Sequence, residues 1–106
     1  MGLPSLTAEQ RAAALEKAAV ARRTRAQLKE RLKRNGTSLS DVLASGATDD
    51  VIGKMRVSEV IESMPGVGKV RAAKIMERLD IAPSRRLRGL GTKQRSALER
   101  EFEVGD

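Results

Sequence analysis

The first 36 residues carry the pattern of one long helix. No Gly or Pro interrupts the chain from Ala8 to Arg34. Thr7 and Gln10 have the spacing of a capping box, in which each side chain accepts from the backbone amide of the other residue. The pair Asn35-Gly36 is typical of a left-handed helix end. These signals predict a helix of about 27 residues.

Apolar and basic positions fall on neighbouring stripes of this helix. The apolar stripe is made of Ala14, Ala18, Ala21, Leu28 and Leu32, and only its two leucines are large enough to dock firmly. Because an alanine-rich helix without packing is marginal in water, we expect the earlier turns to project from the rest of the protein. The basic stripe is made of Arg11, Arg22, Arg25, Lys29 and Lys33.

Short amphipathic segments follow, each bounded by Gly, Pro or a capping side chain. Ser38 is placed to cap a helix that ends near Gly46, and Thr92 is placed to cap the last helix. The pattern predicts helical segments at residues 39–46, 49–52, 57–64, 69–79 and 93–101. Alternating runs that would predict a strand are missing. We therefore expect an all-α fold, with the long helix in residues 1–36, a compact helical body in residues 37–102 and a tail at residues 103–106.

Composition excludes several classes of chemistry. The chain has no Cys and no His, which removes disulfides, zinc fingers, thiol nucleophiles and His-based acid–base catalysis. Its only aromatic residue is Phe102, so the stacking used to read single-stranded nucleic acid is not expected. We expect no metal, no cofactor and no catalytic residue. The start Met1–Pro4 lacks the features of a secretory signal, and no long apolar run predicts a membrane helix, so we expect a cytoplasmic protein.

Charge is distributed in blocks. The chain carries 21 Lys and Arg against 14 Asp and Glu, a net charge of +7. Counted along the sequence, residues 1–36 carry +6, residues 37–64 carry −3, residues 65–100 carry +7 and residues 101–106 carry −3. Two basic zones on either side of an acidic middle favour a polyanionic partner.

A glycine hairpin is the most informative motif. It lies in Met64–Ala72, between two predicted helices, with glycines at 66 and 68. Glycine permits positive φ and leaves the backbone open to a phosphodiester. We expect the free amides of Gly66 to Lys69 to lie at the positive end of the following helix, which is a site for phosphate. Val67 should hold the hairpin to the core.

The same four residues, Pro65–Gly68, also suit a plain tight turn between helices. Two features favour phosphate binding instead. Cations directly follow Gly68 at the start of the next predicted helix, where the helix dipole disfavours them unless an anion is bound. Most of the second basic zone also lies in the residues that follow the hairpin. The candidate phosphate-binding residues here are Pro65, Gly66, Val67, Gly68, Lys69 and Arg71.

A second basic element is the loop Arg85–Gly91. Leu87 and Leu90 are spaced to anchor it to the core, and the three arginines of the loop should then point outward. Arginine forks suit phosphate oxygens and a narrow minor groove, whereas the alternative is a solvated basic loop. The candidate residues are Arg85, Arg86, Arg88 and Gly89. The basic stripe of the first helix is a candidate second contact, with a merely solubilising face as its alternative.

Several motifs resemble one known family over nearly the whole chain. Leu6–Ala18, Val51–Met55, the hairpin with Lys69 and the loop Arg85–Gly91 occur in the order seen in the actinobacterial integration host factors. The resemblance implies a helix-two-turns-helix (H2TH) body and a nucleoid-associated protein, which we expect to be a monomer. Such a protein binds duplex DNA with little sequence preference, bends or compacts it, and affects transcription and phage integration. The family's DNA contacts, carried onto this chain, fall on Pro65, Gly66, Gly68, Lys69, Arg85, Arg86 and Arg88.

Three other functions compete with this reading. An RNA- or ribosome-associated protein is the strongest, since phosphate sites do not distinguish the two backbones and the sequence shows no reader of the 2′-hydroxyl. A module of the transcription machinery would use the acidic middle. DNA glycosylases share the helical body, but here Asp80 falls at a helix end and fits a turn better than catalysis.

Overall fold

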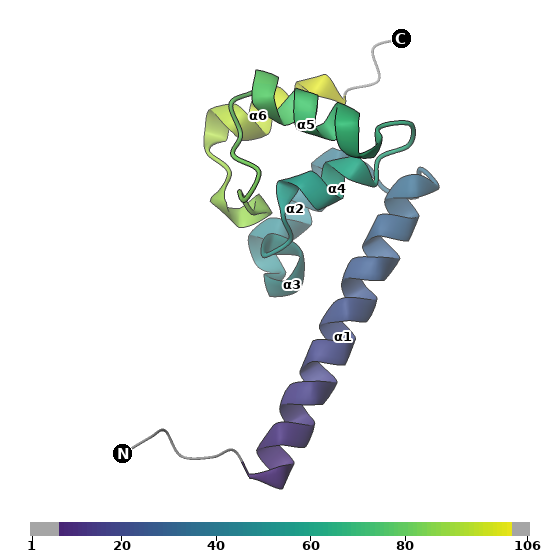
Figure 1. Cartoon of the computed structure of the whole chain (residues 1–106), viewed down its shortest axis with the longest axis vertical. Coiled ribbons are helices and arrows are strands. Elements are labelled where there is room, and N and C mark those ends of the chain that lie inside the picture. The colour runs from purple at the N-terminus through teal and green to yellow at the C-terminus, as the bar shows by residue number, and fades with distance from the viewer. Residues whose placement is uncertain (1–6, 103–106) are drawn as a thin grey trace.

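The computed structural model describes residues 7–102, and helices joined by short connections account for that range (Figure 1). In chain order they are α1 (Ala8–Lys33), α2 (Leu39–Thr48), α3 (Asp50–Gly53), α4 (Val57–Glu62), α5 (Gly68–Arg78), the short 3-10 turn η1 (Leu87–Gly89) and α6 (Thr92–Glu101). Within residues 7–102 there is no strand beyond one isolated bridge between Arg56 and Arg86. The all-α prediction is confirmed, while the expected tail at residues 103–106 lies outside the described residues.

Helix α1 begins as its sequence predicts. Thr7 Oγ1 accepts from the Gln10 amide at 3.0 Å, and Gln10 Oε1 accepts from the Thr7 amide at 2.9 Å. The helix ends near the predicted stop, where Asn35 has a φ of 58°. Its 26 residues make a rod about 39 Å long. Leu28 and Leu32 are its buried residues, and the earlier turns extend away from the body (Figure 1), as expected.

Several later helices differ by one or two residues from their predicted bounds; α4, for example, ends at Glu62 rather than at residue 64. Helix α2 continues past Gly46 to Thr48, because Gly46 is packed in the helix interior against Gly53 and Leu87. A Cβ on Gly53 would lie 2.5 Å from the Gly46 carbonyl oxygen, so the close approach of α2 and α3 requires glycine there.

The cap of α6 is Gly91 rather than Thr92. The Gly91 amide donates to Gln94 Oε1 at 3.1 Å. A side chain three residues into the helix therefore satisfies this amide without the Thr92 hydroxyl.

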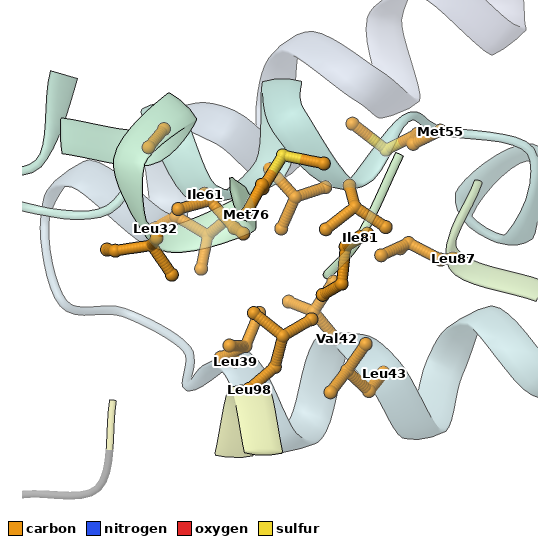
Figure 2. Packing of buried hydrophobic residues seen from close by; sticks show 14 of the residues in the cluster. Leu32, Leu39, Val42, Leu43, Met55, Ile61, Met76, Ile81, Leu87 and Leu98 are labelled. Carbon is orange, nitrogen blue, oxygen red and sulfur yellow. The ribbon is translucent and has the colours of Figure 1, made fainter. Parts of the chain in front are cut away.

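One apolar cluster holds the short helices together. Figure 2 shows Leu32 of α1, Leu39 of α2, Ile61 of α4, Met76 of α5 and Leu98 of α6 in the same interior. Each fully buried large aliphatic side chain contributes about 1.5–3 kcal/mol relative to its exposed state. The core is small, so its main role for function is to fix the loops at its edge.

In the described residues, no helix has the length and apolar character to cross a membrane.

An arginine clamp joins α5 to α6. Arg78 Nη1 and Nη2 donate to Glu101 Oε1 and Oε2, each at 2.8 Å. The hydrogen bond from Arg78 holds the pKa of Glu101 below its ordinary value, against a smaller opposing effect of burial. The ionised Glu101 carboxylate therefore stabilises the folded protein at pH values above the ordinary carboxyl pKa. This stabilisation is lost as the pH falls through the lowered pKa of the folded state.

We expect E101Q to remove this acid-sensitive part of stability. The melting temperature of E101Q should fall less than that of the wild type between about pH 6 and about pH 3, measured by circular dichroism. E99Q is the control, because Glu99 makes only a long pair with Arg95 at 3.8 Å within α6. Parallel pH profiles for E101Q and the wild type would contradict the assignment.

Candidate nucleic-acid interface

The hairpin between α4 and α5 has the backbone that its glycines predict. Gly66 has a φ of 75° and Gly68 a φ of 69°, a region that other residues rarely adopt. A Cβ built at either position meets nothing within 4 Å. Glycine is therefore required here by backbone conformation and not by crowding, and the face of the hairpin is open.

Three amides of the hairpin are free rather than four. Val67 donates its amide to the Met64 carbonyl at 3.1 Å, which corrects the expectation that all amides from Gly66 to Lys69 are available. Within residues 7–102, no oxygen accepts from the amides of Gly66, Gly68 or Lys69. Gly68 and Lys69 begin α5, whose first turn holds no acidic residue, so the positive end of the helix is uncompensated.

The core fixes the position of these amides. Val67 is half-buried and packs against the apolar cluster, as predicted. Pro65, Lys69 and Arg71 are exposed. The hairpin is thus held from behind by one apolar side chain and presents backbone donors and cations to solvent.

The arginine loop is an ordered element. Leu87 is buried and Leu90 packs against the core, so both predicted anchors are confirmed. Two backbone hydrogen bonds fasten the loop to the connection before α4: the Leu87 amide donates to the Met55 carbonyl at 3.0 Å, and the Val57 amide donates to the Arg85 carbonyl at 2.9 Å. No local sequence pattern indicated this backbone attachment.

The three guanidinium groups are less free than the sequence analysis expected. Each donates to a protein oxygen: Arg85 to the Gly89 carbonyl at 3.1 Å, Arg86 to the Lys54 carbonyl at 2.7 Å and Arg88 to the Asp50 carboxylate. All three side chains nevertheless remain exposed. Since a guanidinium carries five N–H donors, these contacts position the groups and leave further donors for an anion.

Asp50 lies among cations. Its Oδ1 accepts from Arg88, and its Oδ2 lies 3.9 Å from Lys54 Nζ. The hydrogen bond from Arg88, followed by the charges of Arg88 and Lys54, lowers the pKa of Asp50. The acidic middle of the chain is therefore partly used within the fold.

One groove brings the predicted basic elements together. Arg25 of α1, Lys69 of the hairpin and Arg86 of the loop line the same open groove. Its other lining residues are Val51, Lys54, Arg56, Ser58, Glu59 and Glu62. Cations outnumber acids in this lining, so the groove suits an extended anion.

The basic stripe of α1 divides at this groove. Lys29 pairs with Glu59 of α4 at 3.4 Å, which joins α1 to the body beside Arg25. Arg11, Arg22 and Lys33 are exposed and lie outside the groove lining. The structure thus brings one stripe residue to the hairpin and the loop, and leaves these three cations along the projecting helix.

The sequence analysis missed three residues at this surface. Lys54 and Arg56 line the groove because the connection after α3 folds against the arginine loop, a contact no local pattern shows. Val70 is 72% exposed beside Lys69. Its place off the apolar stripe of α5 could have identified it, since the buried residues of that helix are Ala72, Ile75 and Met76.

Comparison with known proteins gives consistent matches. The family model of the S13-like H2TH domain matches residues 32–102, including the end of α1. The integration host factor of Streptomyces coelicolor is 66% identical over 102 residues, covering 96% of this chain and 95% of the relative. That of Mycobacterium tuberculosis is 63% identical over 102 residues, covering 96% of this chain and 97% of the relative.

A solved structure described as sIHF bound to an 8-bp palindromic DNA is similar to this chain with a TM-score of 0.81 and 63% identity. The match covers 82% of this chain and 98% of that one. Together with the family model, it confirms the expected helix-two-turns-helix fold.

We expect the hairpin glycines to be required for stability. G66A or G68A should destabilise the protein by about 1–2 kcal/mol, because alanine pays for the left-handed conformation. G89A is the control: Gly89 does not have a positive φ, and a Cβ there meets only the Arg85 side chain, at 3.4 Å. Urea unfolding measures the difference. If G68A were as stable as G89A, the hairpin backbone would differ from the one described.

Proposed function

We propose that this chain, which belongs to the actinobacterial integration host factor family built on the S13-like H2TH domain, binds duplex DNA through the phosphate backbone. The observation that carries the proposal is the set of open amides at Gly66, Gly68 and Lys69, beside a groove that Lys69, Arg86 and Arg25 line together. The DNA in the related solved structure supports it.

In this proposal the hairpin holds one phosphate. Amides at a helix N-terminus donate to phosphate oxygens, and the helix dipole adds a favourable field. Lys69 and Arg71 supply formal charge at the rim. Pro65 begins the turn and Val67 fixes its position, so that their part in the interface is to shape it.

The arginine loop holds phosphates farther along the duplex. Arg85, Arg86 and Arg88 are exposed and anchored by their backbone, and Gly89 accepts from Arg85. Because the Arg85 and Arg86 guanidiniums are each hydrogen-bonded to a backbone carbonyl, less side-chain freedom is lost when they bind a phosphate oxygen. The loop therefore presents prepositioned charge.

Helix α1 supplies a second contact along its length. We propose that its basic stripe lies against the duplex beyond the groove, at Arg11, Arg22, Arg25, Lys29 and Lys33. The projecting turns have little packing of their own, so neutralising their charges on DNA would also stabilise the helix. Lys29 has to share its charge with Glu59.

These contacts carry little sequence information. Amides and cations that meet phosphates position a protein on DNA without reading bases. Contacts on both sides of the groove would draw the duplex around the body and bend it. We propose a monomeric, non-catalytic protein of the nucleoid that bends or compacts DNA, and thereby affects transcription and site-specific phage integration.

RNA is the second candidate, because phosphate contacts do not exclude an RNA backbone and the matching domain family is S13-like. Duplex DNA, duplex RNA and single strands of equal length should be compared by fluorescence anisotropy. We expect the tightest binding to duplex DNA. Tighter binding to RNA would replace the proposed function with the RNA-associated one.

Salt dependence tests the phosphate mechanism. The five cations of the hairpin and the loop predict that log K for duplex DNA falls with log salt with a slope of roughly −4 to −5, and contacts from α1 would make the slope steeper. Anisotropy titrations at several salt concentrations give this slope. A slope near zero would show that neutralised phosphates do not drive binding.

The arginine loop should contribute equally to all sequences. R85A/R86A/R88A is expected to weaken binding to unrelated duplexes by the same factor and to make the salt slope shallower by about three units. R31A/R34A/R100A removes the same charge from exposed positions outside the proposed interface and should have a much smaller effect. If the loop variant altered preference at one base pair, the loop would be reading sequence.

A further inference from the structure

Asp50 is an acidic residue set within the basic rim of the proposed interface. Its side chain is 73% exposed, it contacts Arg88, and Lys54 lies 3.9 Å away. Lys17 of α1 also acts on its charge. A carboxylate in this place opposes the binding of any anion nearby, which raises the question of what it does.

The N-terminal cap of α3 does not depend on the Asp50 carboxylate. Helix α3 is capped by the preceding residue: Asp49 Oδ1 accepts from the Val51 amide at 2.9 Å and from the Ile52 amide at 3.1 Å. Among the described residues, the recorded partners of the Asp50 carboxylate are the side chains of Arg88 and Lys54. Its contacts are thus with two groups that the interface offers to phosphate.

We propose that Asp50 is an internal competitor for the DNA phosphate, occupying Arg88 in the free protein and releasing it when a duplex binds. This inference rests on the proposed function. Carboxylate and phosphate oxygens take the same guanidinium N–H groups with similar geometry. Arg88 is 47% exposed in its side chain, so a phosphate can approach the pair from solvent.

The energies allow this exchange. An exposed ion pair is screened by water and salt and is worth little, so the Arg88–Asp50 pair opens at small cost. A duplex carries about one negative charge per 1.7 Å along its axis, and neighbouring phosphates would hold Arg85 and Arg86 at the same time. The polyanion therefore displaces Asp50, which then lies near the bound backbone and repels it.

The consequence of this competition is a lower affinity for DNA. Competition for Arg88 and repulsion of the phosphate both lower affinity, so Asp50 limits how tightly the loop holds DNA. For a protein that binds DNA without sequence preference, contacts that release readily let the enzymes of replication and transcription displace it from the duplex.

The test compares D50N with the wild type on one duplex. D50N should bind about two- to fivefold more tightly near 0.1 M salt, the range that an exposed ion pair accounts for. D41N is the control, because it changes the net charge equally at an exposed carboxylate that makes no ion pair within residues 7–102. Circular dichroism checks that both variants are folded.

A second pair of variants isolates Arg88. In the R88A background, the gain from D50N should shrink to the part that comes from repulsion of the phosphate, because the contested cation is gone. An equal gain from D50N with and without Arg88 would overturn competition, as would D50N binding no better than D41N, or worse than the wild type. Failure of the wild type to bind duplex DNA would instead refute the proposed function itself.

Discussion

The interface depends on backbone amides that the fold leaves without a partner. Two residues with positive φ, Gly66 and Gly68, turn the chain so that α5 begins with open amides and an uncompensated dipole. Buried amides are normally satisfied, and exposed ones bind water. Here they lie beside Lys69 at the edge of a cationic groove, where a phosphate can replace that water. The surrounding cations act on an anion that these amides position.

The rest of the fold serves to keep separate basic elements in register. The apolar cluster is small, yet it holds Val67 behind the hairpin and Leu87 behind the arginine loop. Backbone hydrogen bonds at Met55 and Val57 tie that loop to the connection before α4. Because hairpin and loop are fixed to one core, Lys69 and Arg86 line the same groove, as the proposed binding of an extended anion requires. Helix α1 differs, since it docks through its last turns and extends away from the core (Figure 1). Its exposed cations continue the basic stripe along this projecting part.

Local chemistry explains which features the sequence could predict. The Thr7 cap, the hairpin glycines and the buried Leu87 follow from residues a few positions apart, and the structure confirms them. The bonds from Arg86 to Lys54 and from Arg88 to Asp50 join residues 32 and 38 positions apart. No periodicity encodes such contacts, because they depend on how short helices pack. The same limit hid the groove residues. The bond from the Val67 amide to the Met64 carbonyl is instead local, a turn within the hairpin that the sequence analysis did not anticipate.

The central claim is that the amides of Gly66, Gly68 and Lys69 receive a DNA phosphate. Titrating ¹⁵N-labelled protein with a short duplex and recording ¹H–¹⁵N spectra observes these amides directly. The account predicts that their proton resonances move downfield as hydrogen bonds to phosphate form, while the amide of Val67, already bonded to Met64, moves much less. Unchanged hairpin amides at saturation, with shifts confined to other surfaces, would contradict it.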